Sequence, residues 1–270
     1  MSNLQTRILT AIVLGAVALW LTWIGGLGFT LFAIAIALAM FHEWTTLTAP
    51  RQTVFSRLFG WAWLLLTAVL LATGQGALVV IATLAVGTAI LLVTQWRNGR
   101  GWPAAGLFYA GFSAIALSLL RGAEQFGFTA IIFLFAVVWS TDIAAYFNGR
   151  ALGGPKLAPR FSPGKTWSGA IGGAAAAVAG GILVASLVVA PGGWMVPAVA
   201  LLLSVVAQAG DLGESWVKRR FGAKDSGTLL PGHGGVLDRV DGLVAAAALL
   251  YVLGAIVAGP DTPFAIFLSF

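Results

Sequence analysis

The sequence predicts an all-α polytopic integral membrane protein with about nine transmembrane helices. Of its 270 residues, 59% are hydrophobic and 9% are charged, and the mean hydropathy is +0.95. A soluble domain carries about 25% charged residues, and a chain with so few would expose large apolar patches. The apolar runs are long and continuous, whereas a transmembrane barrel would show short alternating segments. These observations exclude a soluble domain, a disordered chain and a barrel.

Nine apolar runs are long enough to be transmembrane helices, because a bilayer core of about 30 Å requires roughly 20 apolar residues in a helix. Gly25 and Gly26 separate the first two runs, and Gly74-Gln75-Gly76 is the expected turn between the third and the fourth. A second span follows the first at once, which favours an uncleaved first helix over a signal peptide. The predicted spans are 8–24, 27–42, 58–73, 77–95, 104–120, 127–147, 168–190, 195–217 and 241–259.

The basic residues predict the orientation of these spans. With the N-terminus in the cytoplasm, all but one of the 15 Lys and Arg residues fall on the cytoplasmic side, and only Arg121 lies outside. The positive-inside rule therefore predicts an N-in, C-out protein. The positive charge reflects this orientation and attraction to anionic lipid, so we expect no nucleic-acid partner. The chain has no Cys, which excludes disulfides, thiolate metal sites and cysteine nucleophiles.

The charged residues divide the chain into two portions. Most of them lie between Asp142 and Asp241. We therefore expect residues 1–125, with about five spans, to anchor the protein, and residues 126–270, with about four spans, to carry the chemistry. We find no internal repeat, which argues against an inverted-repeat transporter.

Asp142 lies within an otherwise apolar span, near its predicted cytoplasmic end. Intramembrane acids are energetically costly and usually face a polar cavity, where they pair with a cation or a metal. A functional role is therefore the default interpretation. The alternative is an interfacial acid that pairs with Arg150, just beyond the span.

Two pairs of acids repeat the same spacing at the ends of two predicted helices. Asp211 and Glu214 are three residues apart and share one helix face, as do Asp238 and Asp241. Hard oxygen ligands brought together in this way suit Mg²⁺ and, through it, the oxygens of a phosphate. The alternative is that these acids only form local salt bridges and interact with helix dipoles.

Two predicted cytoplasmic loops carry residues that are typical of anion binding, and we expect them to form the site. In one loop, Gly234 and Gly235 follow His233, and glycines allow backbone N–H groups to approach phosphate oxygens and adopt positive φ. The other loop carries Arg150 and Lys165 on a backbone rich in Gly and Pro, which we expect to be irregular. The alternatives are a plain turn for the first loop and a basic loop that touches lipid headgroups for the second.

The run from Ser215 to Asp241 has the form S-x-x-K-R-x4-K-D-x-G-x-x-x-P-G-H-G-G-x-x-D-R-x-D. It resembles the signature of phosphatidate cytidylyltransferases, without a gap. Two upstream motifs also look like this family: Asp142-x3-Tyr146-Phe147-x-Gly149-Arg150 and Ser162-Pro163-x-Lys165-Thr166-Trp167. Family members often carry Glu after the latter motif, where this chain has Ser168, so an acidic contribution there is in doubt. The motifs cover residues 139–242.

The resemblance implies that the protein transfers CMP from CTP to phosphatidic acid, giving CDP-diacylglycerol and pyrophosphate. Catalysis would rest on positioning and electrostatics rather than on a protein nucleophile. By similarity to the family, the metal ligands are Asp211 and Asp238, followed by Asp142 and Asp241. The implied catalytic residues are Lys218, Arg219, Lys224, Asp225, His233 and Arg239, and the implied substrate-binding residues are Arg150, Lys165, Ser215, Gly234 and Gly235.

The resemblance also implies Mg²⁺ as cofactor, a second cation such as K⁺, and a homodimer, although small-residue helix faces such as that of GAIGGAAAAVAGG could equally pack within one chain. We expect a multi-pass protein of the bacterial inner membrane whose active site faces the cytoplasm. The main rival is a channel or transporter with Asp142, Asp211 and Asp238 along an ion pathway, which the concentration of charge on one side disfavours. A CDP-alcohol phosphotransferase is disfavoured because its motif is absent, and a purely structural protein leaves the focused charges unexplained.

Overall fold

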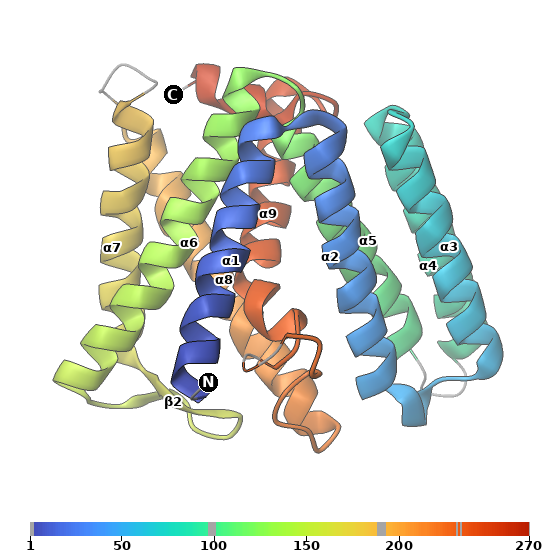
Figure 1. Cartoon of the computed structure of the whole chain (residues 1–270), viewed down its shortest axis with the longest axis horizontal. Coiled ribbons are helices and arrows are strands. Elements are labelled where there is room, and N and C mark those ends of the chain that lie inside the picture. Colours follow the sequence, from blue (N-terminus) through green and yellow to red (C-terminus); the bar gives the residue numbers. More distant parts are fainter. Residues whose placement is uncertain (1–2, 97–100, 188–192, 231, 233, 270) are drawn as a thin grey trace. The chain divides into compact units, whose positions relative to one another are not determined.

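The computed structural model describes residues 3–96, 101–187, 193–230, 232 and 234–269. These residues form nine α-helices, two short strands and two 3-10 segments (Figure 1), which confirms the predicted all-α fold. The helices are α1 Asn3–Ile24, α2 Gly26–Leu47, α3 Val54–Ala72, α4 Ala77–Trp96, α5 Trp102–Arg121, α6 Gln125–Leu152, α7 Trp167–Ser186, α8 Met195–Arg220 and α9 Leu237–Ala258. The strands are β1 Lys156–Ala158 and β2 Ser162–Thr166, and the 3-10 segments are η1 Ala49–Arg51 and η2 Pro263–Ser269.

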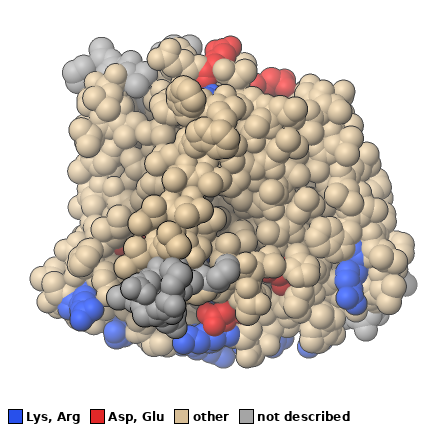
Figure 2. Space-filling view, viewed as in Figure 1, with Lys and Arg blue, Asp and Glu red and all other residues tan. Residues whose placement is uncertain are grey.

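The protein is a multi-pass membrane protein. Eight helices, α2 to α9, are long and apolar enough to cross a membrane, and the apolar part of α1 that the structure describes, Ile8–Ile24, is shorter. Most of the surface in view in Figure 2 carries no charged side chain. A surface of this kind suits contact with lipid tails, in which charged side chains are costly.

The helix boundaries follow local sequence signals. Gly25 and Gly26 have φ values of 65° and 52°, which lets α2 begin directly after α1 ends. The turn at residues 74–76 lies between α3 and α4, as predicted. Helices α6 and α8 run a few residues beyond the predicted ends at 147 and 217 because their polar last turns remain helical. Helix α6 ends where Gly153 takes a φ of 61°.

The chain forms two compact units. Unit 1 comprises Met1–Leu119 and Asp225–Arg239, and unit 2 comprises Leu120–Lys224 and Val240–Phe270. Part of the charged region between α8 and α9 therefore belongs with the N-terminal helices. The functional division at residue 125 stays a prediction.

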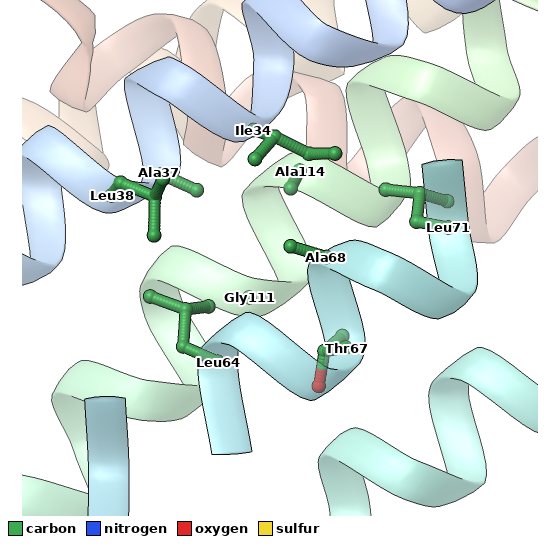
Figure 3. Close-up of a pocket in the computed structure, with 9 residues that line it drawn as sticks. All are labelled: Ile34, Ala37, Leu38, Leu64, Thr67, Ala68, Leu71, Gly111 and Ala114. Carbon is green, nitrogen blue, oxygen red and sulfur yellow. The ribbon is translucent and has the colours of Figure 1, made fainter. Parts of the chain in front are cut away.

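Aromatic residues of α2 form much of the core of unit 1. The ring of Phe41 packs edge-on against Trp61, with centroids 5.1 Å apart. Trp44 donates its indole N–H to the carbonyl of Trp102 at 2.8 Å. A small cavity of about 10 Å³ lies between α2, α3 and α5, and its lining is apolar apart from Thr67 (Figure 3). This cavity is too small for a nucleotide or a lipid headgroup.

A stripe of small residues on α7 packs against α6 and α8 in unit 2. It comprises Gly169, Gly173, Ala177, Gly181 and Ala185, all of which are buried. A Cβ atom at Gly173 would lie 2.7 Å from the backbone oxygen of Thr141 on α6, and one at Gly181 would lie 2.8 Å from the Cβ of Ala200 on α8. The predicted close packing therefore occurs within one chain, and α7 lies beside α6 in Figure 1.

Replacing Gly173 by Val is expected to destabilise the fold by about 1–3 kcal/mol, because the new side chain would overlap the backbone of α6. Thermal unfolding in detergent measures this effect. Ile171→Val is the matched control, since Ile171 lies on the same helix and is 66% exposed. Equal unfolding temperatures for the two variants would contradict the assigned packing of α7.

The basic segment between α6 and α7 is a hairpin rather than the irregular loop that we expected. Strands β1 and β2 are antiparallel, and Lys156 pairs with Thr166 while Ala158 pairs with Ser162. The side chain of Thr166 then accepts a hydrogen bond from the N–H of Gly169 at 3.1 Å and caps α7. The pairing and the cap together fix Lys165 at the base of α7.

Candidate active site

An ion pair joins the hairpin of unit 2 to helix α8. The ammonium of Lys165, on β2, donates to Oδ2 of Asp211, on α8. The hydroxyl of Ser215, one turn along α8, lies 3.5 Å from Oδ1 of Asp211. The two charged side chains are 28% and 36% exposed, so the pair is only partly buried. The structure therefore brings together three residues that the sequence predicts for the site.

Two further acids lie close to this pair. Asp142, on α6, and Asp241, on α9, interact electrostatically with Asp211 and with Lys165. Helices α8 and α9 come very close beside Asp211, because a Cβ atom at Gly210 would lie 2.9 Å from the backbone oxygen of Asp241. Three helices and one hairpin thus place three carboxylates and one ammonium in a single polar cluster.

A buried hydrogen bond fixes α6 against α8 near Asp142. The hydroxyl of Thr141 donates to that of Ser204 at 2.8 Å, and both side chains are buried. Arg150 donates to the hydroxyl of Tyr146 at 3.0 Å. In the part of the chain that the structure describes, the ion pairs do not include Asp142 with Arg150. The interfacial pairing considered for Asp142 is therefore not the arrangement seen.

The basic end of α8 is partly neutralised within the helix. Lys218 forms a 2.6 Å ion pair with Glu214, whose side chain is only 3% exposed. Arg219 donates to the backbone oxygen of Phe161 in the hairpin turn at 3.4 Å and to that of Ala223 at 3.2 Å. Asp211 and Glu214 thus share a face, as predicted, but each is paired with a different lysine.

In unit 1, described residues of the segment 225–236, which we call the signature loop, bind the carboxylate of Asp238. The carboxylate of Asp238 accepts hydrogen bonds from the backbone N–H groups of Ser226, at 3.0 Å, and Gly235, at 2.9 Å. The N–H of Leu230 donates to the carbonyl of Gly234 at 2.9 Å, and Gly234 has a φ of 84°. The N–H of Gly235 already donates to Asp238, so the predicted role of Gly235 toward a phosphate stays a prediction. His233 lies outside the described residues.

Sequence reasoning missed one acid of unit 1. Glu43, near the end of α2, is 1% exposed, and its carboxylate accepts hydrogen bonds from Ser226, Val236 and Leu237 of the loop region. Its sequence signal is the one that singled out Asp142: a carboxylate near the end of an apolar span. The prediction for residues 1–125 is that they only anchor the protein, so Glu43 is not among the predicted site residues.

The donor set of unit 2 fits a divalent cation only in part. Among the residues that the structure describes, no three His, Asp or Glu side chains lie close enough to hold a metal as they stand. Mg²⁺, however, requires only one or two carboxylates, because waters and substrate phosphates complete its coordination. Asp142, Asp211 and Asp241 supply the hard oxygen ligands that Mg²⁺ prefers. The assignment of Mg²⁺ to these acids therefore stays a prediction.

Comparison with known proteins identifies the family. Residues 5–257 match the cytidylyltransferase family. The chain belongs to that family. It is 80% identical to a phosphatidate cytidylyltransferase of Brucella suis, over 100% of both chains. It is 36% identical to one of Pseudomonas aeruginosa, over 93% of this chain and 98% of the other, and 32% identical to one of Bacillus subtilis, over 94% and 98%.

This cytidylyltransferase draws its predicted site residues from both units, and the signature run from Ser215 to Asp241 passes through each of them. Unit 2 holds Asp142, Arg150, Lys165, Asp211, Ser215, Lys218, Arg219, Lys224 and Asp241. Unit 1 holds Asp225, Gly234, Gly235, Asp238 and Arg239. The match confirms the resemblance drawn from the signature and favours a nucleotidyltransferase over a channel or transporter.

Proposed function

We propose that this cytidylyltransferase is a phosphatidate cytidylyltransferase, which converts phosphatidic acid and CTP into CDP-diacylglycerol and pyrophosphate. The observation that carries the proposal is the 80% identity, over both full chains, to a protein of that name. The cluster of Lys165 with three carboxylates supports it, because phosphoryl transfer requires charged groups placed around a phosphate.

The proposed reaction is an in-line displacement at the α-phosphorus of CTP. An oxygen of the lipid phosphate forms a bond to this phosphorus, the bond to the oxygen that bridges to the β-phosphate breaks, and pyrophosphate leaves with that electron pair. Negative charge grows on the leaving group, so cations beside the triphosphate stabilise the transition state. We assign this role to four residues: Lys218, Arg219, Lys224 and Arg239. Asp225 and His233 would orient the nucleotide or the lipid phosphate, and Arg150, Ser215, Gly234 and Gly235 would contact substrate.

We further propose Mg²⁺ as cofactor, held by Asp211 and Asp238 with contributions from Asp142 and Asp241. Bound there, the ion would neutralise charge on the phosphate oxygens. Lys165 would keep Asp211 oriented and would bind a phosphate placed beside this carboxylate. A second cation such as K⁺ is proposed from the family resemblance alone.

The protein is proposed to lie in a bacterial inner membrane with its active site facing the cytoplasm, where CTP is available. The acyl chains of phosphatidic acid would stay among the helices while the headgroup reaches the polar cluster. A homodimer, if it forms, would use other surfaces than the α7 stripe, because that stripe is buried within the chain.

The test uses detergent-purified protein and CTP labelled in its α-phosphate, with chloroform extraction of the products. Label is expected in the lipid fraction only when both phosphatidic acid and Mg²⁺ are present, and EDTA is expected to abolish it. Transfer of label to diacylglycerol instead of phosphatidic acid would overturn the assigned substrate. If folded protein labels no lipid under any metal condition, the proposed function is wrong. Transport would then be the favoured function.

A further inference from the structure

A carboxylate from the second helix lies at the centre of the signature loop. Oε1 of Glu43 accepts the N–H of Val236 at 2.9 Å. Oε2 accepts the N–H of Leu237 at 2.8 Å and the hydroxyl of Ser226 at 3.1 Å. These three donors lie between 183 and 194 residues further along the chain than Glu43. Both oxygens of this buried side chain are thus used to hold one distant segment.

The position of Glu43 agrees with the electrostatics of a helix start. Leu237 is the first residue of α9, and the first N–H groups of a helix have no partner within it. A carboxylate placed there satisfies those donors and interacts favourably with the positive end of the helix. In return, the N–H groups compensate the cost of burying a charged side chain. Glu43 therefore fixes both the start of α9 and the loop that precedes it.

The signature loop packs closely around the Glu43 side chain. A Cβ atom at Gly227 would lie 2.7 Å from Oε1 of Glu43, and one at Gly235 would lie 2.6 Å from Oε2. A side chain at either position would force the carboxylate or, at Gly235, the hydroxyl of Ser226 to move. Close contact with Glu43 is thus one physical reason why both positions of the signature are glycines.

Ser226 links Glu43 to Asp238. Its hydroxyl donates to Glu43, whereas its backbone N–H donates to the carboxylate of Asp238 at 3.0 Å. Leu237, which Glu43 also holds, is the residue before Asp238. One carboxylate from α2 therefore holds both Ser226, which donates to Asp238, and Leu237, which precedes it.

We propose that Glu43 is a positioning residue, which orders the signature loop and thereby sets the orientation of Asp238. It does not touch the reacting atoms. The N-terminal helices accordingly contribute to the active site as well as to anchoring. The kinetic consequence of this proposal rests on the proposed function, whereas its structural consequence does not.

The test compares Glu43→Gln and Glu43→Asp with the wild-type protein. Gln keeps the shape but replaces one acceptor oxygen by an NH₂ group, which faces N–H donors. Asp keeps both acceptors on a shorter side chain. Ser113→Ala is the control, because Ser113 is also buried in unit 1 but bonds only the carbonyl of Tyr109 in its own helix, at 2.6 Å, among the contacts described.

Hydrogen–deuterium exchange of the full-length protein in detergent gives the structural readout. In E43Q we expect amides of residues 226–238 to exchange on the order of tenfold faster, with peptides from α3 to α5 unchanged, because loss of the acceptor leaves the loop N–H groups without partners. E43D is expected to restore part of the protection, and S113A to match the wild type. Unchanged exchange in the loop, or an equal rise throughout unit 1, would overturn the proposal.

Kinetics of CDP-diacylglycerol formation give the second readout. E43Q is expected to raise the Mg²⁺ concentration for half-maximal activity several-fold and to lower kcat on the order of tenfold, with E43D between the two. A residue that only stabilises the fold would reduce the amount of active protein without moving the Mg²⁺ dependence, and that result would overturn the positioning role. If the wild-type protein forms no CDP-diacylglycerol, the proposed function fails, while the exchange experiment still decides whether Glu43 orders the loop.

Discussion

Replacing Asp211 by Asn is expected to lower kcat for CDP-diacylglycerol formation by about a hundredfold or more, because loss of the proposed metal ligand would remove stabilisation of the developing charge. The fold should change little. The ion pair with Lys165 is 28% and 36% exposed, and solvent-exposed pairs of this kind contribute about 0–1 kcal/mol. A large loss of rate with a small loss of stability would show that the pair serves catalysis. The measurements are single-turnover kinetics and thermal unfolding of the same preparation.

A readout besides activity tests whether Asp211 binds the cation. Mg²⁺ without substrate is expected to raise the unfolding temperature of the wild-type protein but not that of D211N, because a ligand stabilises only the state that binds it. Asp261→Asn is the control, since it removes one exposed acid from the same unit. If D211N and D238N keep wild-type rates while D225N abolishes activity, the metal assignment is wrong.

The second large effect is expected at a glycine. Gly235→Ala would place a methyl group 2.6 Å from Oε2 of Glu43 and in overlap with the hydroxyl of Ser226. Overpacking of this kind costs about 1–3 kcal/mol, and here the loop can relieve the overlap only by releasing Glu43 or Ser226. We therefore expect loss of most activity together with a lower unfolding temperature.

Gly15→Ala is the matched control for this prediction. Gly15 lies on α1 in the same unit, and a Cβ atom there would meet nothing within 4 Å. Ala is the better helix former by about 1 kcal/mol, so G15A should be at least as stable as the wild type and equally active. A G235A protein that behaves like G15A would contradict the close contact between the loop and Glu43.

The helices could be predicted from the sequence because the bilayer leaves few choices. In lipid, every backbone polar group must be satisfied within its own segment, so an apolar run of the right length can only be a helix. The predicted helix bounds differ from the observed ones at polar helix ends. The last turns of α6 and α8 carry charged residues and fall outside an apolar window, although they remain helical.

The hairpin of β1 and β2 could not be predicted, since its sequence is rich in Gly, Pro and Lys and has no alternation of apolar residues. Its pairing places Lys156 opposite Thr166, which no pattern in this stretch of sequence indicates. The sequence did indicate Lys165 as a site residue, because a basic side chain suits phosphate. Only the structure shows that Lys165 is paired with Asp211.

The arrangement of the acids could likewise be predicted only in part. The spacing of Asp211 and Glu214 predicted a shared face, but not that a lysine four residues on would pair with Glu214. Glu43 escaped prediction because its partners are backbone N–H groups of a segment far along the chain. A pattern of side chains in one stretch of sequence carries no information on such donors.

The long separation between Glu43 and its partners bears on how the protein is made. Helix α2 is synthesised 183 to 194 residues before the groups that satisfy its carboxylate. At 5–20 residues per second, this interval is roughly 10–40 s. Throughout that time the membrane-inserted nascent chain carries an acid without its final partners. Insertion of the N-terminal helices therefore has to tolerate this carboxyl group until translation reaches α9, and truncation before residue 226 would leave it without these partners.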